Sequence, residues 1–170
     1  MNSKERRLDI IRSLNQSQHP IKGCKFAEDF EVTRQVIVKD IAILRAEGND
    51  IIATPEGYVM NRKNNLFRRI IVSSHEKQDI RSELESIIKY GGIIEDVIIE
   101  HPFYGEIKAM MMLKTLEDID NFTNEFNNAE IAPLSVLTGG IHLHTISAES
   151  EEILNKIEKE LGEKGFLISD

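Results

Sequence analysis

A short polar stretch, residues 61–65 (NRKNN), separates two parts of the chain whose apolar residues follow different spacings. Before it, apolar residues recur three and four positions apart, which is the period of an amphipathic α-helix. After it, apolar runs typical of β-strands alternate with further helical patterns. The chain has 170 residues, enough for two small cores. We therefore predict two domains, residues 1–62 and 66–170, joined by this polar linker.

The first part predicts three helices followed by a β-hairpin. The helices are expected at residues 3–14, 24–30 and 33–47. Ser3 and Thr33 are expected to cap the first and third of these, and Gly48 favours the end of the third. Residues 51–60 are expected to form two short strands around a Pro-Glu-Gly turn. This order of elements is that of a winged helix-turn-helix, which binds DNA.

The third helix is the expected recognition helix, because a helix-turn-helix contacts bases through the first residues of its second helix. Here those residues are Thr33, Arg34 and Gln35, and the latter two suit guanine and adenine respectively. Four further cations are expected at the phosphates or at the edge of the groove: Lys22, Lys25, Lys39 and Arg45. The alternative, a merely solvated helix face, is weaker because the whole order of elements fits.

Charge is divided unequally between the two parts. The net charge of −8 disfavours nucleic acid as an average, but residues 1–65 carry 11 Lys and Arg against 9 Asp and Glu. Residues 66–170 carry 10 against 20, so only the first part suits a polyanion. No apolar run is long enough to span a membrane and no signal-peptide pattern opens the chain, so we expect a cytoplasmic protein without a membrane partner. Cys24, the single cysteine, is expected to be buried.

The second part predicts an α+β sandwich with an antiparallel or mixed sheet that carries helices on one face. Strands are expected at residues 67–74, 93–100, 105–113, 135–137 and 141–147, with a short terminal strand at 166–169. Helices are expected at residues 76–90, 116–127 and 151–162.

Four side chains of this second part suit one transition-metal ion. His142 and His144 lie two residues apart in a predicted strand, so both imidazoles point to the same face. His75 follows the first strand, and Glu83 lies about two helical turns further on. If the two strands are neighbours, three nitrogens and one carboxylate can meet at zinc, nickel or iron.

Other candidates remain open at this point. Glu76 and Asp79 are competing oxygen donors that spacing alone does not exclude. The turn from His101 to Gly105 offers an imidazole and the phenol of Tyr104, which are expected either to line a ligand pocket or simply to be exposed.

Together these motifs resemble the 3H-domain repressors, a family of niacin-responsive regulators of NAD biosynthesis. The resemblance covers essentially the whole chain, from the helix-turn-helix to the Gly-Gly-Ile-His-Leu-His motif that ends at His144. It implies a homodimer with one nickel or zinc ion per subunit, held by three histidines and one glutamate. Carried onto this sequence, the ligands are His75, Glu83, His142 and His144.

The resemblance also implies a function. The chain is expected to repress genes of NAD synthesis or niacin uptake, with nicotinic acid as co-repressor, by binding an inverted-repeat operator. The carboxylate of nicotinic acid is expected to accept hydrogen bonds from His101, Tyr104 or Arg81. The alternatives are a metal sensor that ignores niacin and a metal-dependent hydrolase, and the DNA-binding part argues against an enzyme.

Overall fold

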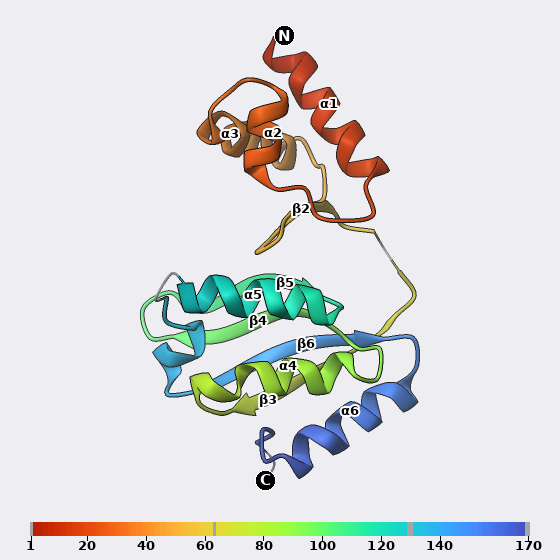
Figure 1. Cartoon of the computed structure of the whole chain (residues 1–170), viewed down its shortest axis with the longest axis vertical. Helices are drawn as coiled ribbons and strands as arrows, with labels where there is room; N and C mark the ends of the chain where they lie inside the picture. The colour runs from red at the N-terminus through yellow and green to blue at the C-terminus, as the bar shows by residue number, and fades with distance from the viewer. Residues whose placement is uncertain (1, 63, 129–130, 169–170) are drawn as a thin grey trace. The chain divides into compact units, whose positions relative to one another are not determined.

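A computed structural model describes residues 2–62, 64–128 and 131–168. The chain forms two compact units, residues 1–63 and 64–170 (Figure 1). The fold is α+β, because each unit combines helices with an antiparallel sheet. None of the described helices is both long enough and apolar enough to cross a membrane.

The first unit is built from helices and one hairpin. Its elements are α1 Ser3–Gln16, α2 Gly23–Asp29, α3 Arg34–Ala46, β1 Ile51–Thr54 and β2 Gly57–Met60. The predicted cap of the third helix is confirmed, since the Thr33 side chain accepts a hydrogen bond from the backbone three residues on. The predicted cap of the first helix is wrong. Asn2 caps α1 because it forms a reciprocal capping box with Glu5, whereas Ser3 has an arginine at the matching position.

Helices α1 and α3 are joined by an apolar core and by a buried ion pair. The core includes Ile10, Leu14, Phe26, Ile37, Ile41 and Leu44. Asp40 of α3 is only 2% exposed and accepts hydrogen bonds from Arg6 Nε at 2.6 Å and from Arg7 at 3.3 Å. The two guanidinium groups neutralise this carboxylate and thereby fix α1 against the recognition helix.

The hairpin is anchored to the segment that precedes α2. Ile21 and Tyr58 exchange two backbone hydrogen bonds of 3.0 and 2.9 Å, which form an isolated antiparallel bridge beside β2. Gly57 has φ +134°, and a Cβ atom there would lie 2.5 Å from the carbonyl oxygen of Ile21. Only glycine fits this close approach. The first unit is therefore a winged helix-turn-helix.

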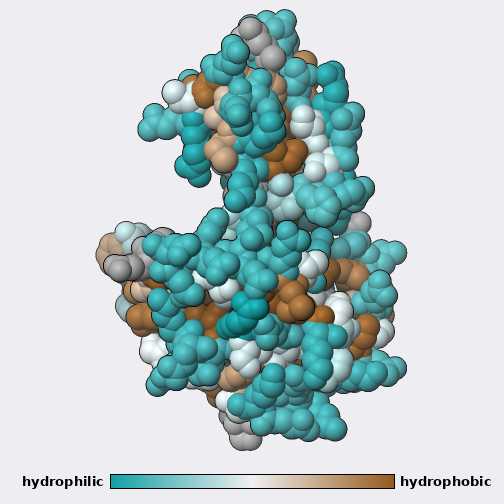
Figure 2. Space-filling view, viewed as in Figure 1, coloured by the Kyte–Doolittle hydropathy of each residue, from teal (hydrophilic) through white to brown (hydrophobic). Residues whose placement is uncertain are grey.

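The second unit is a four-stranded antiparallel sheet of order β3-β6-β4-β5 (Figure 1). Its strands are β3 Phe67–Ser74, β4 Ile93–His101, β5 Gly105–Leu113 and β6 Ile141–Ala148. Its α-helices are α4 Ile80–Ile88, α5 Leu116–Asn128 and α6 Glu151–Glu163. All three helices contribute to one core with Ile71, Ile94 and Ile146 of the sheet, so they cover the same face. Their outer surface is mostly hydrophilic (Figure 2).

Three predicted elements of this unit differ in the structure. The expected strand at 135–137 is a 3₁₀ helix, η2 Leu134–Thr138, because Pro133 and the left-handed Gly139 bracket a segment too short to pair. The expected helix at 76–90 is divided into a 3₁₀ turn, η1 Lys77–Asp79, and α4. The expected terminal strand is reduced to one bridge between Leu167 and Ser73, and residue 169 lies outside the described residues.

Candidate functional site

The predicted metal ligands come from three elements that meet at one end of the sheet. β3 and β6 are direct neighbours, and their register places Ser73 opposite His142. His75 follows the end of β3, while His142 and His144 lie on the helix-covered face of β6. Glu83 reaches this face from α4.

The three imidazoles converge on a single carboxylate oxygen. Glu83 Oε2 lies 2.6 Å from Nε2 of His75 and 3.4 Å from Nε2 of both His142 and His144. These four side chains are at most 4% exposed. The competing donors Glu76 and Asp79 are the cap and the last residue of the 3₁₀ turn η1, and neither is in the group of donor atoms that lie within 4.8 Å of one another. The structure thus brings together the four side chains that the sequence singled out.

Hydrogen bonds fix the tautomer of every imidazole in this cluster. The Nδ1 contacts are His75 with the carbonyl of Glu76 at 2.9 Å, His142 with that of Gly140 at 2.8 Å, and His144 with that of Asp96 at 2.6 Å. A carbonyl oxygen only accepts, so each Nδ1 must carry its proton. Each Nε2 therefore presents a lone pair to the centre of the cluster unless the ring is an imidazolium. This is the arrangement in which histidines bind metals.

Electrostatics inside the cluster favour a cation. Burial raises the pKa of Glu83, but the charge of His144 and the hydrogen bonds from the imidazoles outweigh it and hold that pKa well below its ordinary value. Burial lowers the pKa of His75 and of His144, but the Glu83 carboxylate outweighs it and raises both pKa values. In the metal-free protein, protons therefore supply the positive charge that the buried carboxylate requires.

The residues fit a transition ion. Glu83 Oε1 is buried and has no hydrogen-bond partner in the described part of the chain, so the carboxylate has an acceptor to spare. The donor atoms of His75, Glu83 and His142 all lie within 4.8 Å of one another. Three imidazole nitrogens and one carboxylate are a donor set that suits zinc, nickel or iron(II).

Metal-free and metal-loaded protein should respond oppositely to pH. A histidine with a raised pKa stabilises the fold below the unfolded value of 6.5, and this stability is lost as the pH rises through the raised value. A metal needs unprotonated Nε2 atoms, so its affinity rises over the same range and binding releases protons. As the pH rises above 6.5, we expect the melting temperature of metal-free protein to fall and zinc affinity to increase. Calorimetry in buffers of different ionisation enthalpy measures the released protons, and the absence of any release would contradict this.

Gly140 is a second residue on which the cluster depends. Its φ is +96°, and a Cβ atom there would lie 2.8 Å from the carbonyl oxygen of His75, while its own carbonyl holds His142. We expect Gly140→Ala to weaken zinc binding about 10- to 100-fold, the range seen when groups that orient ligands are lost. Gly139→Ala is the matched control, because Gly139 also has positive φ but has open space at its Cβ position. Equal zinc affinity in the two variants would contradict this role.

The three residues expected to hold the effector make no hydrogen bond or ion pair to the cluster in the described part of the chain. Arg81 is paired with Glu85 at 2.7 Å and with Asp120 at 2.6 Å. Tyr104 is 73% exposed on the β4–β5 hairpin. His101 ends β4, and its Nδ1 accepts the backbone N–H groups of residues 103 and 104 at 3.2 Å. The proton of a neutral His101 therefore sits on Nε2, which makes that atom a donor.

The recognition helix presents the expected polar side chains to solvent. Arg34, Gln35 and Lys39 are exposed on α3, next to the capping residue Thr33. Val38, which was not predicted from the sequence, is 44% exposed on the same helix. An exposed apolar residue one turn after Arg34 suits contact with a thymine methyl group, and its position in the helical period is the signal that points to it.

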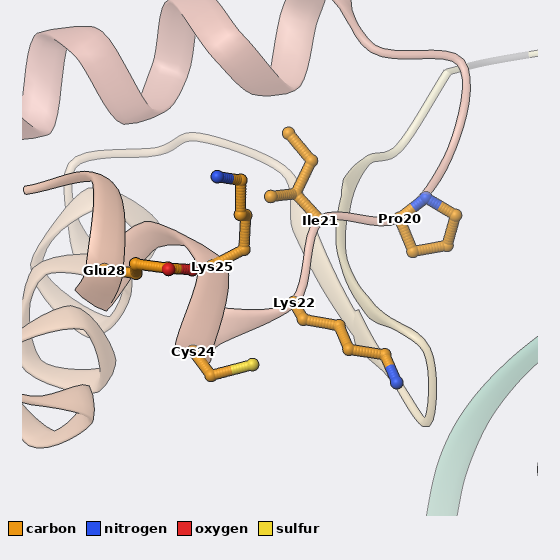
Figure 3. A pocket seen from close by; sticks show the side chains of 6 residues that line it. All are labelled: Pro20, Ile21, Lys22, Cys24, Lys25 and Glu28. Atoms are coloured by element: carbon orange, nitrogen blue, oxygen red, sulfur yellow. The ribbon is translucent and has the colours of Figure 1, made fainter.

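The flanking cations differ in how they are held. Arg45 donates to the carbonyl of Ile51 at 2.8 Å, so it ties α3 to the hairpin, and Lys25 is paired with Asp29. Lys22 and Lys25 line a pocket at the start of α2, where their side chains point away from each other (Figure 3). Cys24 lines the same pocket and is exposed, so the expectation that it is buried was wrong. Within α2 it lies two residues before Phe26, which faces the core, and therefore on the outer side.

Some residues that support the metal-binding histidines could not be recognised from the sequence. Asp96 orients His144 through its main-chain carbonyl, and Phe166 packs against the ring of His75 with centroids 5.5 Å apart. Neither contact depends on a motif. A backbone carbonyl leaves no residue-type signal, and an apolar aromatic near the end of the chain reads as ordinary core.

Comparison with known proteins covers both units. A family model described as "3H domain" matches residues 68–170, and one described as "HTH domain" matches residues 6–59. The chain is 43% identical over 167 residues to the Probable transcription repressor NiaR of Thermotoga maritima, which covers 98% of this chain and 95% of that one. It is 37% identical over 169 residues to the Transcription repressor NadR of Bacillus subtilis, covering 97% and 94%. These relatives are regulators rather than enzymes.

Proposed function

The chain belongs to the NiaR-type family of 3H-domain transcription repressors, and we propose that it represses genes of NAD synthesis or niacin uptake with nicotinic acid as co-repressor. One observation carries this proposal. Three imidazoles, each held by a backbone carbonyl at Nδ1, direct Nε2 at the single buried carboxylate of Glu83. A transition ion can replace the protons that neutralise this carboxylate, and an ion with an open coordination position can bind a small effector.

The metal ligands in this proposal are His75, Glu83, His142 and His144, and the ion is nickel, zinc or iron(II). The ion supplies a coordination position for the pyridine nitrogen or a carboxylate oxygen of nicotinic acid. His101 is the best supported of the three candidate effector residues, because its Nε2 is a donor while Arg81 is occupied by two carboxylates. The geometry gives no separate support for Tyr104.

DNA binding by this chain is proposed to require a homodimer. One recognition helix reads only a few base pairs, so two copies are expected to contact an inverted repeat whose half-sites lie about 34–36 Å apart. Nicotinic acid then favours repression only if it binds the DNA-competent geometry of the dimer more tightly than the other geometry.

Replacing Arg34 with alanine should weaken binding to the specific operator by about 1–3 kcal/mol, roughly 10- to 100-fold, and should change non-specific binding much less. The reason is that Arg34 is exposed in the first turn of α3, where side chains reach base edges. Arg12→Ala is the control, because Arg12 is an exposed arginine of the same unit, on α1, paired with Asp9. Fluorescence anisotropy with operator and scrambled DNA measures both. Equal losses in the two variants would contradict a role of Arg34 in base recognition.

The function is tested by operator titrations of one protein preparation in four states: metal-free or zinc-loaded, each with and without nicotinic acid. We expect tight binding only when both metal and nicotinic acid are present. Tight binding with metal alone would identify a metal sensor instead. Equal affinity in all four states would refute both readings, and nicotinamide serves as the matched ligand that lacks the carboxylate.

A further inference from the structure

Ser73, a residue that belongs to none of the sequence motifs, lies beside the proposed metal-binding side chains. Ser73 of β3 is fully buried, and its hydroxyl has no hydrogen-bond partner in the part of the chain that the structure describes. A buried hydroxyl without a hydrogen-bond partner destabilises a fold.

The register of the sheet surrounds Ser73 with the three imidazoles. His142 is its direct cross-strand partner, and His144 is its diagonal neighbour because it lies opposite Ile71. His75 lies two residues after Ser73, just beyond the end of β3. Direct partners on one face of a sheet have Cβ atoms about 4.5–5.5 Å apart, and diagonal partners lie within about 8 Å.

None of these imidazoles forms a hydrogen bond to Ser73 through a ring nitrogen in the described part of the chain. Each Nδ1 donates to a backbone carbonyl, and each Nε2 faces Glu83. The hydroxyl of Ser73 therefore lies beside the proposed metal site and donates no hydrogen bond within the described part of the chain. A hydroxyl in this position is available to donate a hydrogen bond to an acceptor that binds together with the metal ion.

We propose that Ser73 donates a hydrogen bond to the oxygen ligand that completes the coordination of the metal ion, and so selects oxygen donors over nitrogen donors at the exchangeable position. The chemical class of that ligand is a small carboxylate. This inference rests on the metal centre of the proposed function. It adds a residue that distinguishes between ligands of the bound ion and takes no part in holding the ion itself.

The chain offers a matched control in Ser147. This serine of β6 is also fully buried and also lacks a hydroxyl partner among the described residues, but it lies on the opposite face of the sheet from His142 and His144. Removing either hydroxyl should therefore have a similar effect on the stability of the metal-free fold. Only Ser73 should affect ligands of the metal.

The test uses the full chain loaded with Co²⁺, whose visible spectrum reports each ligand that binds, and titrates it with acetate and with pyridine. We expect Ser73→Ala to lower acetate affinity about tenfold, with pyridine and Co²⁺ affinity changed less than about twofold. Ser147→Ala should match the wild type for both probes, and both variants should melt at or above the wild-type temperature when metal-free.

The other outcomes separate this inference from the proposed function. If Ser73→Ala leaves acetate affinity unchanged, or lowers acetate and pyridine affinity equally, the role of Ser73 is overturned while the metal centre stands. If acetate fails to bind Co²⁺-loaded wild-type protein, the role of Ser73 is likewise overturned. If the wild-type chain does not bind Co²⁺, the metal centre itself is refuted, and the role of Ser73 with it.

Discussion

Replacing Glu83 with glutamine should weaken zinc or nickel binding on the order of a hundredfold or more, beyond the 10- to 100-fold typical of residues that only orient ligands. Glu83 Oε2 is the atom on which all three Nε2 atoms converge, and Oε1 has no hydrogen-bond partner among the described residues. The neutral amide keeps the shape of the side chain but removes the buried negative charge. Competition with a chromogenic chelator measures the affinity, and nicotinic acid should no longer change operator binding.

Glu85→Gln is the matched control for this variant. Glu85 lies two residues further along α4, its side chain is 39% exposed, and it is paired with Arg81. We expect zinc affinity to stay within about twofold of the wild type, since exposed ion pairs contribute little. Unchanged zinc affinity in Glu83→Gln would remove the carboxylate from the metal site and leave only the histidines.

Replacing Asp40 with alanine should destabilise the DNA-binding unit by about 3–5 kcal/mol, because it leaves the buried guanidinium of Arg6 without its partner. The side chains of Arg6 and Asp40 are 11% and 3% exposed, and the bond between them is 2.6 Å. This pair connects α1 to the recognition helix. We therefore expect the first unit to unfold more easily in the variant, and operator binding to be lost with it. Urea titration monitored by circular dichroism measures the change in the free energy of unfolding.

Two controls make this result specific. Asp9→Ala removes an exposed partner of Arg12 on α1 and should cost less than about 1 kcal/mol. Zinc affinity, a property of the second unit, should be unchanged in Asp40→Ala. A loss of less than 1 kcal/mol in Asp40→Ala would show that the ion pair does not hold the two helices together.

Regular elements were predictable where the apolar pattern was long. The strand limits at 67–74 and 105–113 were predicted to the residue, because a polar linker precedes the first apolar run and a tight turn precedes the second. The segment at 135–137 was mispredicted, since three apolar residues between Pro133 and Gly139 fit a strand and a 3₁₀ turn equally well. The cap of α1 was missed because Asn2 and Ser3 are both good caps, and only the reciprocal bond to Glu5 decides between them.

The metal cluster could be assembled from sequence only as a conditional prediction. The two-residue spacing of His142 and His144 fixes their common face, but whether β3 lies beside β6 depends on the order of strands in the sheet. The effector residues show the limit of such reasoning. Arg81 has the right charge for a carboxylate, yet the neighbouring helix already supplies one, Asp120, at 2.6 Å. Long-range pairing of this kind leaves no pattern in the local sequence.

Three imidazoles and one carboxylate are proposed to share a single ion, and X-ray absorption at the zinc edge of the loaded full chain tests this directly. The prediction is scattering from three imidazole rings and at least one oxygen, with zinc–nitrogen and zinc–oxygen distances of about 2.0–2.2 Å. Fewer than three imidazoles, or a sulfur ligand at about 2.3 Å, would contradict it, because the only cysteine of the chain, Cys24, lies in the first unit.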